Sequence, residues 1–146
     1  MSFDEDCQRG ISVEHKVLRV VRKKYPSAEI INGYSGYDIW IPEMNAGIEV
    51  KFDPKSNETG NVVVEIEMSG KLSALFTTEA KWWVFYDGHT YAWIKPRDIF
   101  CCIILNKLSW VEFVGAGDKN PKKAFLIDKR LLFTYARTHT EPEDDF

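Results

Sequence analysis

Charged and apolar positions alternate strictly over one short stretch in the first half of the chain. Within residues 47–52, Glu49 and Lys51 alternate with three apolar residues. Because successive side chains of a strand point to opposite faces, this pattern predicts a strand with one charged and one apolar face. Residues 37–41 also read as a strand, and turn residues at 42–45 separate the two stretches. Together these segments predict a β-hairpin.

Helical periodicity precedes this hairpin. Residues 11–24 place valines on one stripe and basic residues opposite it, with Ser12 suited to cap the helix and Pro26 to end it. Shorter patterns predict the other elements: strands at 28–32, 61–67, 82–86, 90–94, 109–114 and 124–127, a broken helix at 72–80, and helices at about 96–106 and 128–138. This order of elements predicts an α/β fold.

Length and composition exclude several classes of protein. A chain of 146 residues with 45% hydrophobic and 14% aromatic residues is typical of one folded globular domain. No apolar run approaches the roughly 20 residues of a membrane span, and the N-terminus lacks a signal-peptide pattern. We therefore expect an intracellular, cytoplasmic protein with no membrane partner. The three cysteines lack zinc-site spacing and are expected to be reduced thiols.

The net charge of −3 argues at first against a nucleic-acid partner. Seven acidic residues, however, lie near the two ends of the chain: Asp4, Glu5, Asp6, Glu141, Glu143, Asp144 and Asp145. Without those seven charges the net charge becomes +4 over residues 7–140. We therefore expect a mildly basic domain over residues 11–138, between a flexible acidic segment at 1–10 and an acidic tail at 139–146.

The predicted hairpin carries the candidate chemistry. Asp38 shares a face with Glu49 if the numbers of directly paired residues sum to an odd value, and direct pairing would bring their Cβ atoms to roughly 5 Å. Two such carboxylates repel unless a proton, a cation or a divalent metal intervenes. Oxygen ligands without a His or Cys cluster suit magnesium or manganese better than zinc. On the same face, Lys51 could lower the pKa of an attacking water or stabilise a phosphoryl transition state.

Glu14 lies in the first turn of the predicted helix, at the border of its apolar stripe. One interpretation is an ordinary first-turn acid that the helix dipole favours. The other is a carboxylate that reaches over the sheet edge toward Asp38. The spacing alone leaves both interpretations open.

These residues resemble the motif of the PD-(D/E)XK nuclease superfamily. Asp38, Glu49 and Lys51 match the motif in the variant without the leading proline, where Tyr37 stands. Glu14 lies where many members carry a helical glutamate. Residues 65–71 and 77–83 resemble the segments that follow the motif in small single-domain phage members and some Holliday junction resolvases, so the resemblance spans about residues 11–95.

The resemblance implies a restriction-endonuclease-like core of order αβββαβ, in which helices flank a central mixed sheet. It also implies a Mg²⁺- or Mn²⁺-dependent DNA endonuclease, with Holliday-junction-resolvase-like selectivity for branched DNA and a homodimer as one candidate assembly. Asp38, Glu49 and the Val50 carbonyl would bind the metal, and Lys51 would orient or help activate the water. Glu14 would act through a metal-bound water or a second ion.

Further candidates lie outside the motif, and the resemblance bears on Glu65 among them. Glu65 is either an additional metal-shell carboxylate or a solvent-facing residue, and Thr77 and Thr78 are suited to capping or to bonding a phosphate. Residues 115–123 read as a flexible basic loop, either solvated or in contact with DNA. The residues considered for contact with the DNA backbone are Lys71, Lys119, Lys122 and Lys123.

A non-enzymatic function is the alternative: a domain that keeps the nuclease fold for DNA binding or protein interaction. A surface hairpin that happens to carry a Glu-Lys pair would also match the short motif. The presence of all the expected acids and of the lysine favours the enzyme. That interpretation requires Glu14, Asp38, Glu49 and Lys51 to meet at one sheet edge.

Overall fold

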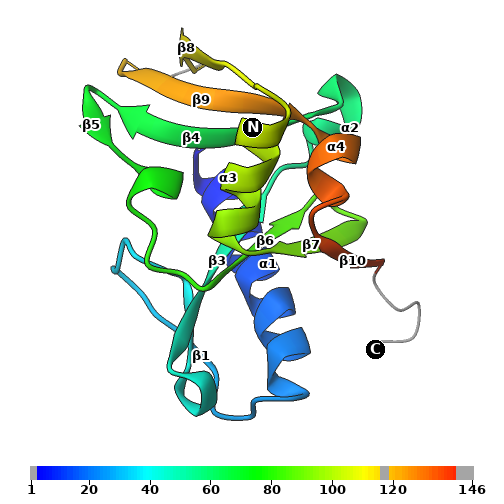
Figure 1. The fold of residues 1–146 in the computed structure, drawn as a ribbon. Helices are drawn as coiled ribbons and strands as arrows, with labels where there is room; N and C mark the ends of the chain where they lie inside the picture. Colours follow the sequence, from blue (N-terminus) through cyan, green and yellow to red (C-terminus); the bar gives the residue numbers. More distant parts are fainter. Residues whose placement is uncertain (1–2, 116–118, 141–146) are drawn as a thin grey trace.

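The computed structural model describes residues 3–115 and 119–140, which form two β-sheets and four α-helices (Figure 1). The first sheet has the strand order β1-β2-β3-β6-β7-β10, and the second has the order β5-β4-β9-β8. The strands of the first sheet are β1 (Glu29–Ile30), β2 (Ile39–Ile41), β3 (Ala46–Phe52), β6 (Trp82–Tyr86), β7 (Thr90–Ile94) and β10 (Arg137–Thr140). Those of the second are β4 (Asn61–Met68), β5 (Lys71–Leu72), β8 (Trp110–Val114) and β9 (Pro121–Asp128).

The first sheet is mixed, as expected. Strands β3 and β6 pair in parallel, and every other pair in the sheet is antiparallel. The helices are α1 (Phe3–Arg22), α2 (Ser56–Thr59), α3 (Pro96–Leu105) and α4 (Lys129–Phe133), with 3₁₀ turns η1 (Pro42–Met44) and η2 (Ala74–Phe76). The prediction of an α/β protein is confirmed at this level.

Helix α1 covers one face of the first sheet. Its stripe of Val13, Val17, Leu18 and Val21 is buried in one apolar cluster with sheet residues such as Ile48. Burial of each such side chain contributes roughly 1.5–3 kcal/mol, so this stripe holds the helix on the sheet. The helix begins at Phe3, earlier than the predicted start at residue 11.

The opposite face is covered by α3 and by the second sheet, with Trp83 and Phe85 packed against Val64 and Ile127 (Figure 1). Helices therefore lie on both faces of the first sheet, and the second sheet, which was not expected, shares the face that α3 covers. The predicted helix at 72–80 does not form, and β5 and η2 occupy its place.

Local backbone geometry explains this difference. Ser69 and Gly70 have φ angles of 52° and 79° and turn β4 back into β5, which pairs with it. Left-handed residues cannot continue a right-handed helix or a strand. The connection between the parallel strands β3 and β6 therefore passes through the second sheet and not through the expected helix.

The β2–β3 hairpin meets the condition stated for Asp38 and Glu49 to share a face. Ile39 pairs with Ile48, Trp40 with Gly47 and Ile41 with Ala46, so paired numbers sum to an odd value. Asn45, at φ 49°, closes the turn after Pro42. The hairpin predicted from alternation is confirmed.

The C-terminal third differs from its prediction in two places. Residues 116–118 lie outside the described residues, but β9 begins at Pro121, so Lys122 and Lys123 belong to a strand and not to a loop. The helix expected at 128–138 ends at Phe133, and residues 137–140 pair with β7 instead. Asp128 begins the short helix by accepting hydrogen bonds from the backbone of Arg130 and Leu131.

A polar network anchors the segment that follows β3. Asp87 is buried, and its carboxylate accepts from the backbone of His89 and Thr90 and pairs with Lys129 at 2.9 Å. Asn57 donates to the Asp87 carbonyl and accepts from Lys129. Asn57 therefore ties the polar segment of residues 53–60 to the β6–β7 turn and to α4.

Among the described residues, no helix has the length and apolar character needed to cross a membrane.

Candidate active site

The site forms where β2 begins beside the middle of β3. Asp38 immediately precedes β2, and its backbone N–H donates to the Ile48 carbonyl at 2.9 Å. Its carboxylate oxygen Oδ2 accepts from the Val50 N–H at 2.7 Å. Asp38 lies directly before the Ile39–Ile48 pair, and its side chain hydrogen-bonds that of Glu49. The hairpin thus holds the Asp38 carboxylate at the edge of β3.

The backbone of Val50 faces the same edge. In a strand, the N–H and the C=O of one residue point to the same neighbour. The carbonyl of Gly47, three residues earlier in β3, accepts from the Lys81 N–H on the β6 side. The Val50 N–H instead donates to Asp38 on the β2 side. The Val50 carbonyl therefore lies on the Asp38 side, as the resemblance implied for a metal ligand.

Glu49 and Lys51 share the face of β3 that packs toward the second sheet. The Lys51 Nζ lies 3.4 Å from a Glu49 carboxylate oxygen, and their side chains are 38% and 16% exposed. Nζ also lies 5.2 Å from the centre of the Trp83 ring. The Trp83 indole donates to the Thr78 hydroxyl at 2.9 Å, which holds that ring in place. The ammonium is thus fixed between a carboxylate and an aromatic face.

Two carboxyl groups respond to the charge of Asp38. Burial raises the pKa of Glu49 from its ordinary 4.5 to about 7, Lys51 opposes that rise, and Asp38 adds to it through its charge and a side-chain hydrogen bond. Burial and, next, the Asp38 charge raise the pKa of Glu14 on α1. The Asp38 charge thus acts on one acid of the helix and on one acid of the strand.

The chemistry of these donors fits a hard divalent cation. The Asp38, Glu49 and Glu14 carboxylates and the Val50 carbonyl are all oxygen ligands of the kind that Mg²⁺ and Mn²⁺ prefer. Across residues 3–115 and 119–140, no three His, Cys, Asp or Glu side chains are arranged so that they could hold a metal ion. In the described arrangement, Lys51 is the partner of Glu49.

Other predicted site residues have structural partners elsewhere. Glu65 accepts from the Ser73 hydroxyl at 2.7 Å and pairs with Lys122 at 3.7 Å, so its contacts lie at the second sheet. Thr78 accepts from the Ala80 N–H and from Trp83, and Thr77 donates to the carbonyl of Ala74. Glu65 and Thr77 thus have partners away from Asp38, whereas Thr78 is connected to the site through Trp83.

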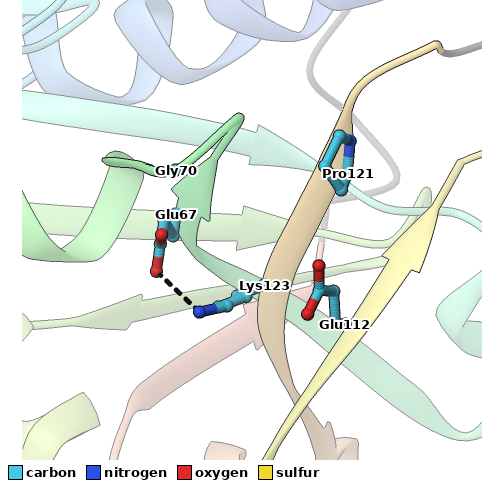
Figure 2. A pocket seen from close by; sticks show the side chains of 5 residues that line it. All are labelled: Glu67, Gly70, Glu112, Pro121 and Lys123. Atoms are coloured by element: carbon cyan, nitrogen blue, oxygen red, sulfur yellow. Dashed lines mark ion pairs between the residues drawn. The ribbon is translucent and has the colours of Figure 1, made fainter.

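The basic residues of the second sheet lie among acids. Figure 2 shows a pocket in which Lys123 pairs with Glu67 at 3.4 Å, while Glu112 lines the same pocket. The Lys123 ammonium also lies 4.7 Å from the centre of the Trp110 ring. Two carboxylates around one ammonium repel a phosphate, so this surface does not favour the predicted contact with the DNA backbone. Lys71 and Lys119 are exposed.

Two aromatic residues beside the acids were not predicted as part of the site. A Cβ at Gly47 would lie 2.4 Å from the Tyr37 ring, so Tyr37 covers this glycine on the Glu49 face of β3. The Tyr34 ring contacts the Tyr37 ring, and the Tyr34 hydroxyl donates to Glu79. A glycine inside a strand was the available sequence signal, because it marks a close approach by another group.

Comparisons with known proteins add no relative, since no family model, curated protein or solved structure matches this chain.

Proposed function

We propose that this chain is a divalent-metal-dependent DNA endonuclease of the PD-(D/E)XK kind that hydrolyses phosphodiester bonds. The observation that carries the proposal is the geometry around Asp38: the Val50 N–H donates to its carboxylate, beside Glu49, whose pKa is raised first by burial and also by Asp38. Lys51 completes the set through its ion pair with Glu49. Clusters of carboxylates with raised pKa values are typical of functional sites.

Each residue has a distinct role in this proposal. Asp38, Glu49 and the Val50 carbonyl would hold Mg²⁺ or Mn²⁺. When bound, that ion lowers the pKa of water and offsets charge on the phosphate. Lys51 orients the attacking water and stabilises the charge that develops on the phosphoryl oxygens. Glu14 hydrogen-bonds water at the helix side of the site. The water oxygen bonds to phosphorus, one P–O ester bond breaks, and the leaving oxygen takes up a proton.

The fold supports part of the expected restriction-endonuclease-like core. Helix α1 and the β2–β3 hairpin occur in the expected order, and β6 pairs in parallel with β3. The second sheet stands in place of the expected crossover helix, so we propose a variant of that core. Selectivity for branched DNA and assembly as a homodimer belong to the same proposal, because a two-fold dimer suits a two-fold junction.

A cleavage panel tests the proposal. Linear, nicked, single-stranded, flap and four-way-junction DNA are incubated with the protein and Mg²⁺ or Mn²⁺. We expect metal-dependent cleavage that Glu49→Gln and Lys51→Met abolish. The matched controls are Glu67→Gln and Lys123→Met, because this Glu-Lys pair has the same 3.4 Å separation on the second sheet. No cleavage of any substrate, or equal rates for both pairs of variants, would contradict the proposal.

A second candidate is a non-catalytic domain that binds DNA or a protein through the same face. The specific observation in its favour is the lack, among the described residues, of three metal-ligand side chains already arranged for an ion. It predicts DNA binding without metal-dependent cleavage, and binding that Glu49→Gln leaves unchanged.

A further inference from the structure

An exposed aromatic residue is held rigidly beside the proposed site. The Tyr34 side chain is 44% exposed, yet its hydroxyl donates to the Glu79 carboxylate and its ring centre lies 4.8 Å from that of Tyr37. The hydrogen bond to Glu79 raises the pKa of the Tyr34 phenol, which keeps the donor protonated. An exposed ring fixed at its hydroxyl end and along one side loses little freedom when it binds a ligand.

The backbone on both sides keeps this ring in place. A Cβ at Gly36 would lie 2.3 Å from the Glu79 carboxylate and 2.5 Å from the Tyr34 ring, so the close fit depends on glycine. The Glu79 N–H donates to the Gly36 carbonyl at 3.3 Å. Segments far apart in the sequence are thereby tied together around the Tyr34 ring.

The position of the ring relative to the acids follows from Tyr37. The Tyr37 ring lies over Gly47, which is two strand positions, or roughly 7 Å, before Glu49 on the same face. Tyr37 also directly precedes Asp38 in the chain. The Tyr34 ring is the exposed outer member of this pair, and its centre lies 4.8 Å from that of Tyr37.

We propose that Tyr34 stacks on an unpaired base next to the scissile phosphate, so that the substrate is single-stranded or locally unpaired DNA. This inference rests on the proposed nuclease function. Stacking needs a base whose face is free, whereas both faces of a base inside a duplex are covered by its neighbours. An aromatic side chain is sequence-tolerant in this role because every base presents a π-face. Tyr34 thereby selects the structure of the strand and not its sequence.

Binding measurements in a non-cleaving background test the role of Tyr34. In Glu49→Gln protein with Mg²⁺, fluorescence anisotropy compares a labelled oligothymidylate with a blunt duplex of the same length. We expect Tyr34→Ala to weaken single-strand binding by about 5- to 150-fold and duplex binding by less than about twofold. Tyr34→Phe keeps the ring face and should remain within about threefold of the parent on the single strand.

Trp110→Ala is the matched control, because it removes another exposed aromatic ring, on the second sheet. Its affinity for the single strand should be unchanged. Equal losses by Tyr34→Ala on both DNAs, no loss on the single strand, or a loss in Tyr34→Phe as large as in Tyr34→Ala would each overturn the stacking role.

Cleavage by otherwise wild-type protein separates this inference from the proposed function. If the wild type cleaves DNA, Glu49→Gln does not, and Tyr34→Ala cleaves single-stranded and duplex DNA like the wild type, the stacking role alone fails. If the wild type cleaves no DNA, the proposed function fails, and the inference fails with it.

Discussion

Replacement of Glu49 by glutamine should stabilise the folded protein above about pH 7, although it removes an ion pair. Burial raises the pKa of Glu49 from 4.5 to about 7, so the folded protein binds a proton on this group more tightly than the unfolded chain does. Its contribution to stability is therefore complete below pH 4.5 and is lost as the pH rises through 7. Each pKa unit corresponds to about 1.4 kcal/mol, and the whole shift to about 3 kcal/mol. Glutamine has nearly the same shape and does not ionise.

Urea unfolding from pH 4 to pH 8, without divalent metal, measures this effect. The wild type should lose up to about 3 kcal/mol relative to Glu49→Gln across that range, and the two proteins should converge toward pH 4. Glu67→Gln removes a carboxylate from an ion pair of the same length and shows what loss of a Glu-Lys pair does by itself. Parallel stability curves for the wild type and Glu49→Gln would refute the reasoning.

The same titration predicts how metal should act. Because a cation favours the ionised carboxylate, Mg²⁺ or Mn²⁺ should stabilise the wild type more at pH 8 than at pH 5.5, and should stabilise Glu49→Gln less. Thermal unfolding with and without the ion measures the difference. An equal shift in both proteins would show that the ion binds elsewhere.

Two further predictions concern the scaffold. Lys129→Met leaves Asp87 buried without its cation and should cost about 3–5 kcal/mol in urea unfolding at pH 7. Burial alone would raise the pKa of Asp87, but its hydrogen bonds and Lys129 lower it, so the wild-type network should lose stability as the pH falls toward 3, and an unchanged midpoint in the variant would contradict this account. Gly47→Ala would place a Cβ 2.4 Å from the Tyr37 ring and should cost about 1–3 kcal/mol by the same measurement, whereas no loss would show that the ring moves freely.

Short-range patterns predicted the hairpin and the pairing of its acids. Alternation with a period of two assigned Glu49 and Lys51 to one face, whereas the odd register that Asp38 requires was a condition that only the structure could supply. Glu14 was less certain from the sequence, because an acid in a first helical turn has two explanations. The Asp38 charge raises the pKa of Glu14 only because α1 is packed on the sheet.

Local sequence patterns could not predict the second sheet. Glycine, lysine and proline around residue 120 favour a loop by composition. In the structure, however, Lys123 lies in a strand, opposite Glu67 of one neighbouring strand and Glu112 of the other. The left-handed turn at Ser69 and Gly70 likewise prevents the helix expected at residues 72–80. Both outcomes depend on pairing between segments far apart in the chain, as does the contact between Tyr34 and Glu79.

The rate of DNA cleavage by Asp38→Asn, compared with the wild type in Mg²⁺, tests the central claim most directly. Asparagine keeps the size of the side chain and an oxygen that can accept from the Val50 N–H, so the hairpin should remain folded. The account predicts metal-dependent cleavage by the wild type and a loss on the order of 100-fold or more in the variant. Equal cleavage by the two proteins, or no cleavage by the wild type, would contradict it.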